Sequence, residues 1–375
     1  MLRRLSRWVL PACVLAGLSL MVAMGVAEIL CRIAGVRCVP HGYYRIDPGT
    51  GLVLARPDYS GVSCSDVGTV SIRTNELGFR GPLFSDSDTT RPRVLFLGDS
   101  FVQALNAPYD STFVARVARA LPCQSLAAGV AGWGQGDELL WLKTYGLALR
   151  PDVVVLCVFL GNDLSVDNLA RDHISSHGYT VDAHGILGGR DASRSLWSSL
   201  LERTVYGSDA YWILRARLAN FAWFLRTRLL HRENFRHAPY LRSFLTIYER
   251  RLEERRNCYE IFFDLLGQFA ALAEEQHFRL LVATIPWDCT LYPSRFSQVV
   301  EDARRSRSEY DPALADSLIG AYMGEHRLEL VDLGAAFREH GDPRAAFSPR
   351  DGHFSPLGHR WAAEVLARRL APSGF

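Results

Sequence analysis

The chain has 375 residues, of which 48% are hydrophobic, and its formal net charge is +2 at pH 7. This length is enough for one substantial domain with accessory segments. A near-neutral balance excludes the strongly basic surface that nucleic-acid binding normally requires, so we expect no nucleic-acid partner.

The chain begins with an apolar run from Trp8 to Ala27 that carries no charge. The run is about as long as a helix that crosses a bilayer. Three arginines, the last of them Arg7, precede it, and only Arg32 and Arg37 follow it closely. This bias favours a cytoplasmic N-terminus. Residues 1–34 are therefore interpreted as a single-pass anchor in the inner (cytoplasmic) membrane, with the body of the protein on the periplasmic or extracellular side.

Two other interpretations of the N-terminus stay open. Gly25-Val26-Ala27 is an acceptable cleavage site for a signal peptide, which would be removed from the mature protein. Ile29-Leu30-Cys31 resembles a lipoprotein site, although Leu30 is large for the position before the cysteine. Both alternatives still imply export.

Residues 35–92 are rich in Gly, Pro, Asp and Ser and contain short β-like runs such as Thr69–Arg73. This pattern predicts a small, hairpin-rich neck. Cys38 and Cys64 lie in the neck and could pair in an oxidising compartment. None of the eight cysteines has zinc-like spacing, so no metal is expected.

From residue 93 to residue 375, apolar runs typical of strands alternate with amphipathic runs typical of helices. We expect strands at Val94–Leu97, Ser125–Ala128, Val153–Leu160, Arg279–Ile285 and Leu328–Leu333. We expect helices after Asp110 as a cap, near Asp137–Leu149, over Ile261–Phe269 and after Ser355. Continuous apolar strands separated by such helices predict a parallel sheet covered on both faces.

A long insertion at about residues 164–256 interrupts the alternation. It contains a helical stretch, Ala210–Leu230, in which aromatic residues are interleaved with arginines. We interpret it as a helical cap packed on the main domain. A lid that covers the substrate or faces a membrane is the alternative, because arginines beside aromatic residues suit an interface.

Four short clusters carry the candidate chemistry: Gly98-Asp99-Ser100, Gly129-Val130-Ala131-Gly132, Gly161-Asn162-Asp163 and Asp351-Gly352-His353. Three of them follow predicted strands, and the fourth precedes the last helix. The carboxyl ends of parallel strands meet at one edge of a sheet, where reactive groups collect. We therefore expect the clusters to converge.

Together the clusters supply what ester cleavage needs. Ser100 is a nucleophile once a base takes its proton, and His353 is the candidate base. Asp351 could accept the other imidazole N–H and fix its tautomer. The backbone N–H groups of Ser100 and Gly132 and the side-chain amide of Asn162 could stabilise an oxyanion.

The four clusters resemble the conserved blocks of the GDSL/SGNH hydrolase superfamily, whose catalytic Ser, Gly, Asn and His match the residues just named. Three positions depart from the family pattern. Phe101 replaces the leucine of the first block, Ala127 stands where an asparagine is common, and Leu160 occupies the usual glycine position.

Two further stretches resemble particular members. The D-x-H spacing of Asp351 and His353 resembles the branch related to polysaccharide O-acetylation enzymes. Thr74–Gly81 is similar to the segment before the first block in membrane-anchored members.

The resemblance implies a flavodoxin-like three-layer α/β/α sandwich with a central parallel sheet. It also implies a serine esterase that needs no cofactor and works through an acyl-serine intermediate. The expected substrate is an O-acyl ester on an envelope or exported glycan, with acetyl as the expected acyl group. An O-acetyltransferase that passes the acyl group to a sugar hydroxyl is one alternative. A non-catalytic glycan-binding or assembly protein is the other.

Other residues near the clusters have more modest expected roles. Trp133 and Trp287 are candidates for the walls of a substrate pocket, with positions in the core as the alternative. Asp99 and Asp163 are expected to support their loops, and His359 is expected to pack or hydrogen-bond within the last helix.

Overall fold

The computed structural model of the chain describes residues 2–39, 41–65, 68–164, 179–181, 187–189, 208–229, 244–348 and 352–371. Its centre is a parallel sheet of five strands in the order β6-β5-β7-β10-β11. The strands are β5 (Arg93–Gly98), β6 (Gln124–Gly129), β7 (Val153–Phe159), β10 (Arg279–Ile285) and β11 (Glu329–Asp332). Counted along the chain, this order is 2-1-3-4-5, which is the flavodoxin-like arrangement. The predicted fold class is confirmed.

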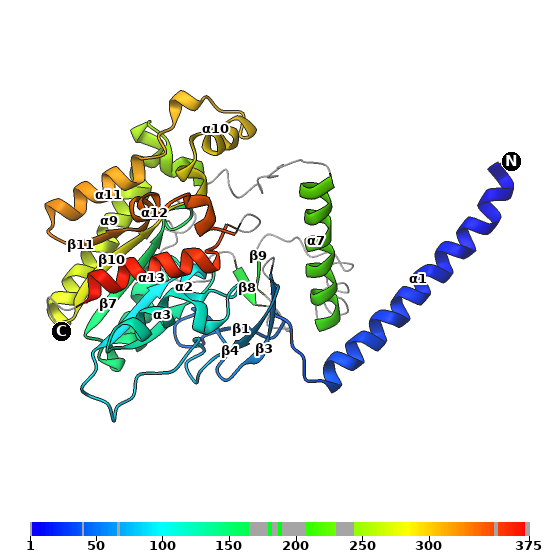
Figure 1. The fold of residues 1–375 in the computed structure, drawn as a ribbon, viewed down its shortest axis with the longest axis horizontal. Helices are drawn as coiled ribbons and strands as arrows, with labels where there is room; N and C mark the ends of the chain where they lie inside the picture. The colour runs from blue at the N-terminus through cyan, green and yellow to red at the C-terminus, as the bar shows by residue number, and fades with distance from the viewer. Residues whose placement is uncertain are drawn as a thin grey trace.

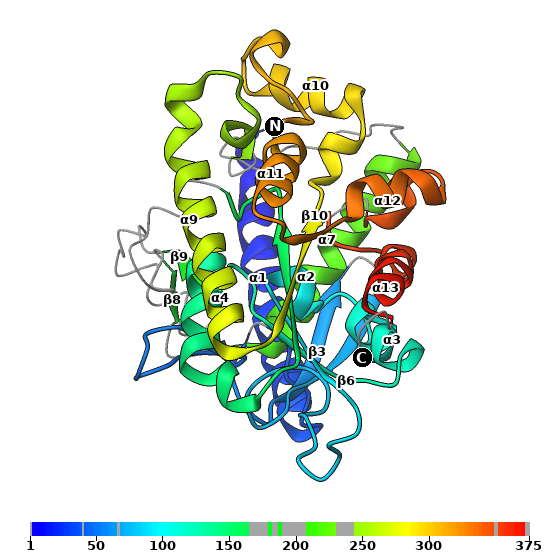
Figure 2. The ribbon, with the colours of Figure 1, turned by 90° about the vertical axis from the view of Figure 1, so that its left-hand side faces the viewer.

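Helices cover both faces of the sheet (Figures 1 and 2). Successive residues of a strand point to opposite faces. In β5, Val94 and Phe96 therefore join one apolar core with α3 (Phe113–Ala120), α12 (Leu333–His340) and α13 (Pro356–Leu370). Leu95 and Leu97 join the other core, which includes side chains of α4 (Gln135–Trp141), α9 (Leu252–Gln276), α10 (Pro293–Asp302) and α11 (Leu314–Glu325).

The five predicted strands and a helix at each of the four predicted places are present, but α10, α11 and α12 were not predicted. The helix predicted near Asp137–Leu149 is α-helical only to Trp141 and continues as a π turn and a 3₁₀ turn. The first predicted helix also differs in detail, because its N-cap is Thr112 and not Asp110. Residues Tyr109–Ser111 form a short 3₁₀ turn, so the α-helix begins later. The Thr112 side chain then accepts a hydrogen bond from the Ala115 N–H at 3.3 Å.

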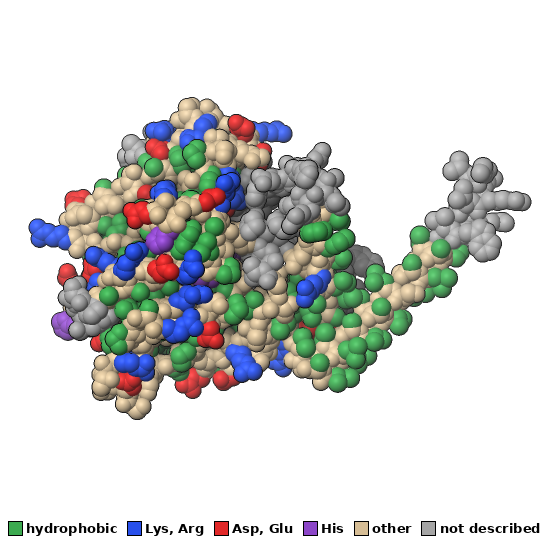
Figure 3. Space-filling model, viewed as in Figure 1, with side chains coloured by type: hydrophobic (Ala, Val, Ile, Leu, Met, Phe, Trp, Pro, Cys, Tyr) green, Lys and Arg blue, Asp and Glu red, His purple; other side chains and the backbone are tan. Residues whose placement is uncertain are grey.

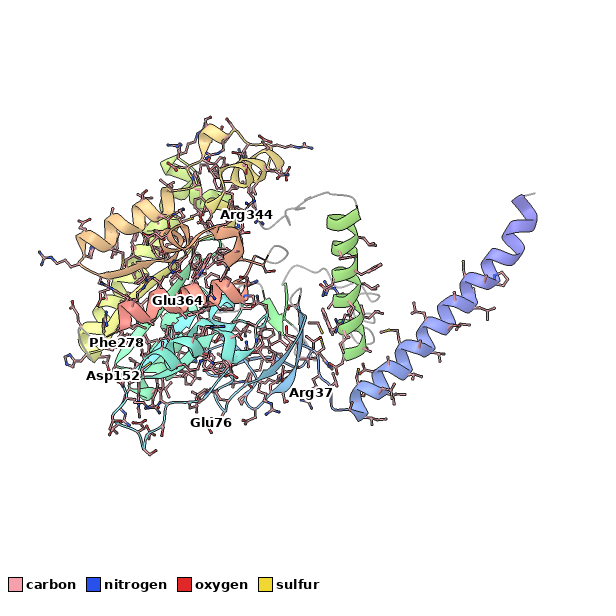
Figure 4. All side chains as sticks on the ribbon, in the orientation of Figure 1. Arg37, Glu76, Asp152, Phe278, Arg344 and Glu364 are labelled. Carbon is pink, nitrogen blue, oxygen red and sulfur yellow. The ribbon has the colours of Figure 1, made fainter. Side chains whose placement is uncertain are left out.

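The strands run across the domain from one side to the other. In Figure 4, Asp152 and Phe278, which precede β7 and β10, mark the amino edge of the sheet. Arg344 lies toward the opposite, carboxyl edge. That edge is on the side of the molecule where α7 (Asp209–Leu229) lies (Figure 1).

The neck contains two antiparallel hairpins, β1 (Tyr44–Ile46) with β2 (Val53–Ala55), and β3 (Ser60–Ser65) with β4 (Gly68–Arg73). It does not stand apart from the sheet. Tyr43 and Leu52 are fully buried in the same apolar core as the sheet residues Leu95 and Leu97. The neck is therefore packed against the main domain.

The N-terminal helix α1 (Leu2–Ile33) extends away from the rest of the molecule (Figure 1). Its segment Pro11–Ile33 has a mean hydropathy of 2.2, and no residue of it is buried. Length and composition make it a helix that could cross a membrane. Hydrophobic side chains cover it, whereas charged side chains of both signs are spread over the main domain (Figure 3).

The described parts of the insertion include the short hairpin β8 (Tyr179–Val181) and β9 (Leu187–Gly189) and the helix α7. The predicted helix at Ala210–Leu230 is therefore present. Its start contacts the end of α1, where the Glu28 carboxylate accepts hydrogen bonds from the Ser208 hydroxyl at 2.9 Å and the Ala210 N–H at 3.2 Å. Residues 165–178, 182–186, 190–207 and 230–243 lie outside the described part of the chain.

Candidate active site

The Ser100 loop lies where β5 leaves the core and the short helix α2 (Ser100–Gln103) begins. Asp99 caps this helix, because its Oδ1 accepts a hydrogen bond from the Phe101 N–H at 2.8 Å. Gly98 is needed for close packing: a Cβ there would lie 2.5 Å from Val102 Cγ2. The loop therefore presents the Ser100 hydroxyl at the carboxyl edge of the sheet.

His353 reaches this serine from the other end of the chain. Its Nε2 lies 2.8 Å from Ser100 Oγ, across 253 residues of sequence. The loop that carries His353 is closed by the Ser348 N–H, which donates to the His353 carbonyl at 2.7 Å. The Phe101 ring packs beside the imidazole, with ring centroids 5.0 Å apart. The contact between Ser100 and His353 therefore rests on a braced loop.

The third predicted member of this set, Asp351, lies outside the described residues. Its role in orienting the imidazole stays a prediction. The neighbouring Gly352 has φ +76°, a left-handed conformation that favours glycine. The loop therefore turns sharply just before the histidine.

The two other predicted oxyanion residues follow the strands on either side of β5. Gly132 follows β6 and has φ +86°. Its loop is anchored to the Ser100 loop by the Val130 N–H, which donates to the Gly98 carbonyl at 3.3 Å. Asn162 follows β7, and its buried Oδ1 has no hydrogen-bond partner among the described residues. Three adjacent strand ends thus bring Ser100, Gly132 and Asn162 to one edge of the sheet.

Carboxyl groups behind the site are buried. Burial raises the pKa of Asp99 to about 6, and it raises the pKa of Asp163 well above its ordinary value. Asp163 Oδ2 accepts a hydrogen bond from the Phe159 N–H at 2.7 Å, so this side chain braces the loop that carries Asn162. Glu138, also fully buried, has its pKa raised by burial and by the nearby Asp163. Asp99 and Asp163 thus support their loops by hydrogen bonds, whereas neither carboxylate oxygen of Glu138 has a hydrogen-bond partner among the described residues.

The second histidine of the last block, His359, has a different environment. It is buried, and its Nδ1 accepts a hydrogen bond from the Phe113 N–H at 3.3 Å. Burial lowers the pKa of His359 to about 3. Its ring stacks on Phe113 at an interplanar angle of 19°. A neutral imidazole that holds the start of α3 has a structural role.

The structure places both candidate pocket tryptophans in the core. Trp133 is 1% exposed, and its indole N–H donates to the Val53 carbonyl at 2.8 Å. Trp287 is 3% exposed and packs among Phe244, Tyr248 and Phe296. This burial favours the core alternative for both residues over an assignment to substrate binding.

Two polar residues that the sequence did not single out lie against the site. Gln103, three residues after Ser100, is 3% exposed and hydrogen-bonds to the loop that carries Gly132. Arg80 of the neck is equally buried and donates to the carbonyls of Gln103 and Ala104 at the end of α2 and to the carbonyl of Ala107 beyond it. The sequence did contain a signal for Gln103: it is a long polar residue one helical turn after the nucleophile, and apolar residues lie between the two.

No group of three or more His, Cys, Asp or Glu side chains among the described residues is arranged to hold a metal ion. The site consists of a serine, an imidazole and candidate N–H donors. Such an arrangement can perform acyl transfer by nucleophilic attack.

The strand order of the sheet, with helices on both faces and Ser100 at its carboxyl edge, fits the α/β fold that the four sequence clusters imply, that of the SGNH hydrolases. A search of solved structures found, among others, a lipolytic protein of the G-D-S-L family from Desulfitobacterium hafniense, the acetyl xylan esterase AlAXEase, and a catalytic mutant of Axe2, an acetylxylan esterase from Geobacillus stearothermophilus.

These three matches have low sequence identity and low TM-scores. The Desulfitobacterium protein is 12% identical with a TM-score of 0.36, and the match covers 75% of this chain and 100% of that one. AlAXEase is 13% identical with a TM-score of 0.39, and the match covers 74% of this chain and 99% of that one. Axe2 is 13% identical with a TM-score of 0.37, and the match covers 75% of this chain and 94% of that one. No family model matches the sequence, and a search of curated proteins found no match.

Proposed function

We propose that this protein is a serine esterase that hydrolyses O-acyl esters through an acyl-serine intermediate. One observation carries the proposal: His353 Nε2 lies 2.8 Å from Ser100 Oγ. This is the distance at which an imidazole can accept the hydroxyl proton. A serine hydroxyl alone is a poor nucleophile, and the contact supplies the base that it needs.

The reaction then follows in two halves. Ser100 Oγ attacks the ester carbonyl while its proton passes to His353 Nε2, and the carbonyl oxygen becomes an oxyanion. The N–H groups of Ser100 and Gly132 and the amide of Asn162 are the proposed donors to this oxyanion. When the carbon–oxygen bond of the ester breaks, His353 returns the proton to the leaving alcohol. Water repeats the sequence on the acyl-serine, which releases the carboxylic acid and restores Ser100.

Asp351 is the proposed partner of the second imidazole nitrogen. A carboxylate there would keep Nε2 unprotonated in the resting site and stabilise the imidazolium that forms during attack. Neither the formation nor the hydrolysis of the acyl-serine needs a metal or an organic cofactor.

We propose an acetyl ester on an envelope or exported glycan as the substrate class. The resemblance of the Asp351–His353 spacing to polysaccharide O-acetylation enzymes supports this choice. The apolar helix α1 supports a position at the membrane, with the catalytic domain on the exported side.

Turnover of acetyl esters by the full chain in detergent tests the proposal. The wild-type protein should release acetate from p-nitrophenyl acetate and from acetylated oligosaccharides. Ser100→Ala should reduce the rate to that of buffer with an unchanged thermal midpoint. Ser297→Ala is a matched control, because among the described residues this serine hydrogen-bonds only within α10, to the Pro293 carbonyl, and it should leave the rate unchanged.

Product analysis separates the esterase from its alternatives. If an acetylated acceptor sugar dominates over free acetate, the protein is an acyltransferase rather than a hydrolase. If the folded wild-type protein binds acetylated oligosaccharides and cleaves no acetyl ester, it is a glycan-binding protein.

A further inference from the structure

We propose that the neck is part of the catalytic apparatus: through Gln103 and the indole of Trp133, it fixes the backbone on both sides of Gly132. This inference rests on the proposed esterase function and adds positioning residues to it. The neck would then do more than connect the anchor to the enzyme.

Gln103 makes the first connection. Its Oε1 accepts hydrogen bonds from the Ala131 N–H at 3.1 Å and from the Tyr44 hydroxyl at 3.3 Å. Its Nε2 donates to the Tyr43 hydroxyl at 3.4 Å. Both tyrosines belong to the neck and are buried. A side-chain amide can accept and donate at once, which is what this position between the neck and the loop requires.

Trp133 makes the second connection. Its indole N–H donates to the Val53 carbonyl of β2 at 2.8 Å. The ring is buried beside Phe79, another neck residue, with centroids 6.2 Å apart. The residue before Gly132 and the residue after it are therefore both held, and each connection ends on the neck.

Gly132 is the residue that needs this support. With φ +86° and no side chain, its backbone has unusual freedom to rotate. The peptide plane between Ala131 and Gly132 carries the N–H that the proposed mechanism points at the oxyanion. Rotation of that plane would turn the donor away from the substrate. Fixing the neighbouring residues opposes the rotation before the substrate arrives, which is the preorganisation that oxyanion stabilisation requires.

The same part of the neck also supports the serine loop. The buried Arg80 guanidinium donates to the Ala107 carbonyl at 2.9 Å and to two carbonyls at the end of α2. The neck thus contacts both the segment that carries the nucleophile and the segment that carries the oxyanion glycine.

Three variants of the full chain test the proposal. Gln103→Met keeps the length of the side chain and removes the acceptor, whereas Gln103→Glu keeps an acceptor. Tyr145→Phe is the matched control, because it removes a different bond between neck and domain, from the Tyr145 hydroxyl to Asp47 Oδ2 at 2.7 Å. That bond touches neither Gly132 nor Ser100.

Gln103→Met should lower kcat by roughly 10- to 100-fold, because misplacing a donor in the oxyanion site costs rate rather than substrate affinity. KM should stay within about twofold, since the ester is not bound through this donor in the ground state. The affinity for a trifluoromethyl ketone, whose adduct with Ser100 resembles the tetrahedral intermediate, should fall in parallel with kcat/KM. Gln103→Glu should recover most of the activity, and Tyr145→Phe should retain the wild-type kcat.

The rate of amide hydrogen exchange shows whether the loop that carries Gly132 is held in place, and its measurement needs no catalytic turnover. The Ala131 N–H should exchange slowly in the wild-type protein and in Tyr145→Phe, and much faster in Gln103→Met. An unchanged exchange rate in Gln103→Met, or an equal loss of kcat in Tyr145→Phe, would overturn the inference. Failure of the wild-type protein to hydrolyse any ester would instead refute the proposed function, and the exchange rates would still decide whether Gln103 holds the loop.

Discussion

Replacing His359 by asparagine should make the stability of the folded protein less sensitive to acid. The buried imidazole must stay neutral, because its Nδ1 accepts the Phe113 N–H. Asparagine at this position keeps an acceptor near the place of Nδ1 but cannot be protonated. The perturbation therefore removes a titration and preserves the hydrogen bond that begins α3.

The magnitude follows from the two pKa values of His359. Burial lowers the pKa to about 3 in the folded state, against 6.5 for an exposed histidine. Between these values the unfolded chain binds more protons than the folded one, so stability falls as the pH decreases. For this residue, the loss between about pH 7 and about pH 5 is roughly 2 kcal/mol, at about 1.4 kcal/mol for each pKa unit.

Asp99 acts in the opposite direction. Its pKa is raised to about 6 in the folded protein, so its contribution to stability is fully present below its ordinary pKa of 3.8 and is lost as the pH rises through 6. This contribution is common to the wild type and the variant, and it cancels in their difference.

Urea unfolding in detergent at both pH values measures that difference. The wild-type protein should lose about 2 kcal/mol more unfolding free energy than His359→Asn between the two pH values. His277→Asn, a substitution at an exposed, left-handed position after α9, should behave as the wild type. Equal losses in wild type and His359→Asn would refute the assignment of His359 as a buried neutral group.

Three further outcomes are expected. Arg80→Met should lower the unfolding free energy by about 3–5 kcal/mol in urea titrations, because three carbonyls lose a buried charged donor. Arg80→Lys should recover part of the lost stability, and a loss below about 1 kcal/mol in Arg80→Met would contradict the supporting role of Arg80. Gly132→Ala should lower kcat by about 100-fold or more in ester assays, since the left-handed φ resists a side chain; near-normal turnover would exclude Gly132 as a donor. Cys38 and Cys64 are thiols in the structure. Burial raises the pKa of Cys38, and the hydrogen-bonded Cys64 raises it further. Export should oxidise this pair, and peptide mass mapping of protein isolated without reductant should find the disulfide, whereas free thiols would argue against an oxidising compartment.

The sheet could be predicted because its strands are continuous apolar runs. Val153–Phe159 contains no polar residue, so its pattern already indicates a strand buried on both faces. The contact between Ser100 and His353 could also be anticipated, because each belongs to a recognisable motif at a place where the fold brings strand ends and the start of the last helix together.

The contacts made by the neck could not be predicted in the same way. Gln103 and Trp133 are each held by residues 50 or more positions away that belong to irregular or short β segments. No local pattern specifies such partners, since each bond depends on how the neck folds against the domain. Trp287 illustrates the same limit, because an aromatic residue after a strand suits a pocket wall as well as a core until its neighbours are known.

The central claim is that His353 takes the proton of Ser100. The most direct measurement is the rate at which a fluorophosphonate forms an adduct on Ser100, followed by peptide mass spectrometry in the wild type, His353→Asn and His359→Asn. The account predicts rapid modification of Ser100 in the wild type and in folded His359→Asn, and slowing by orders of magnitude in His353→Asn. A folded wild-type protein that remains unmodified, or equal labelling after the loss of His353, would contradict it.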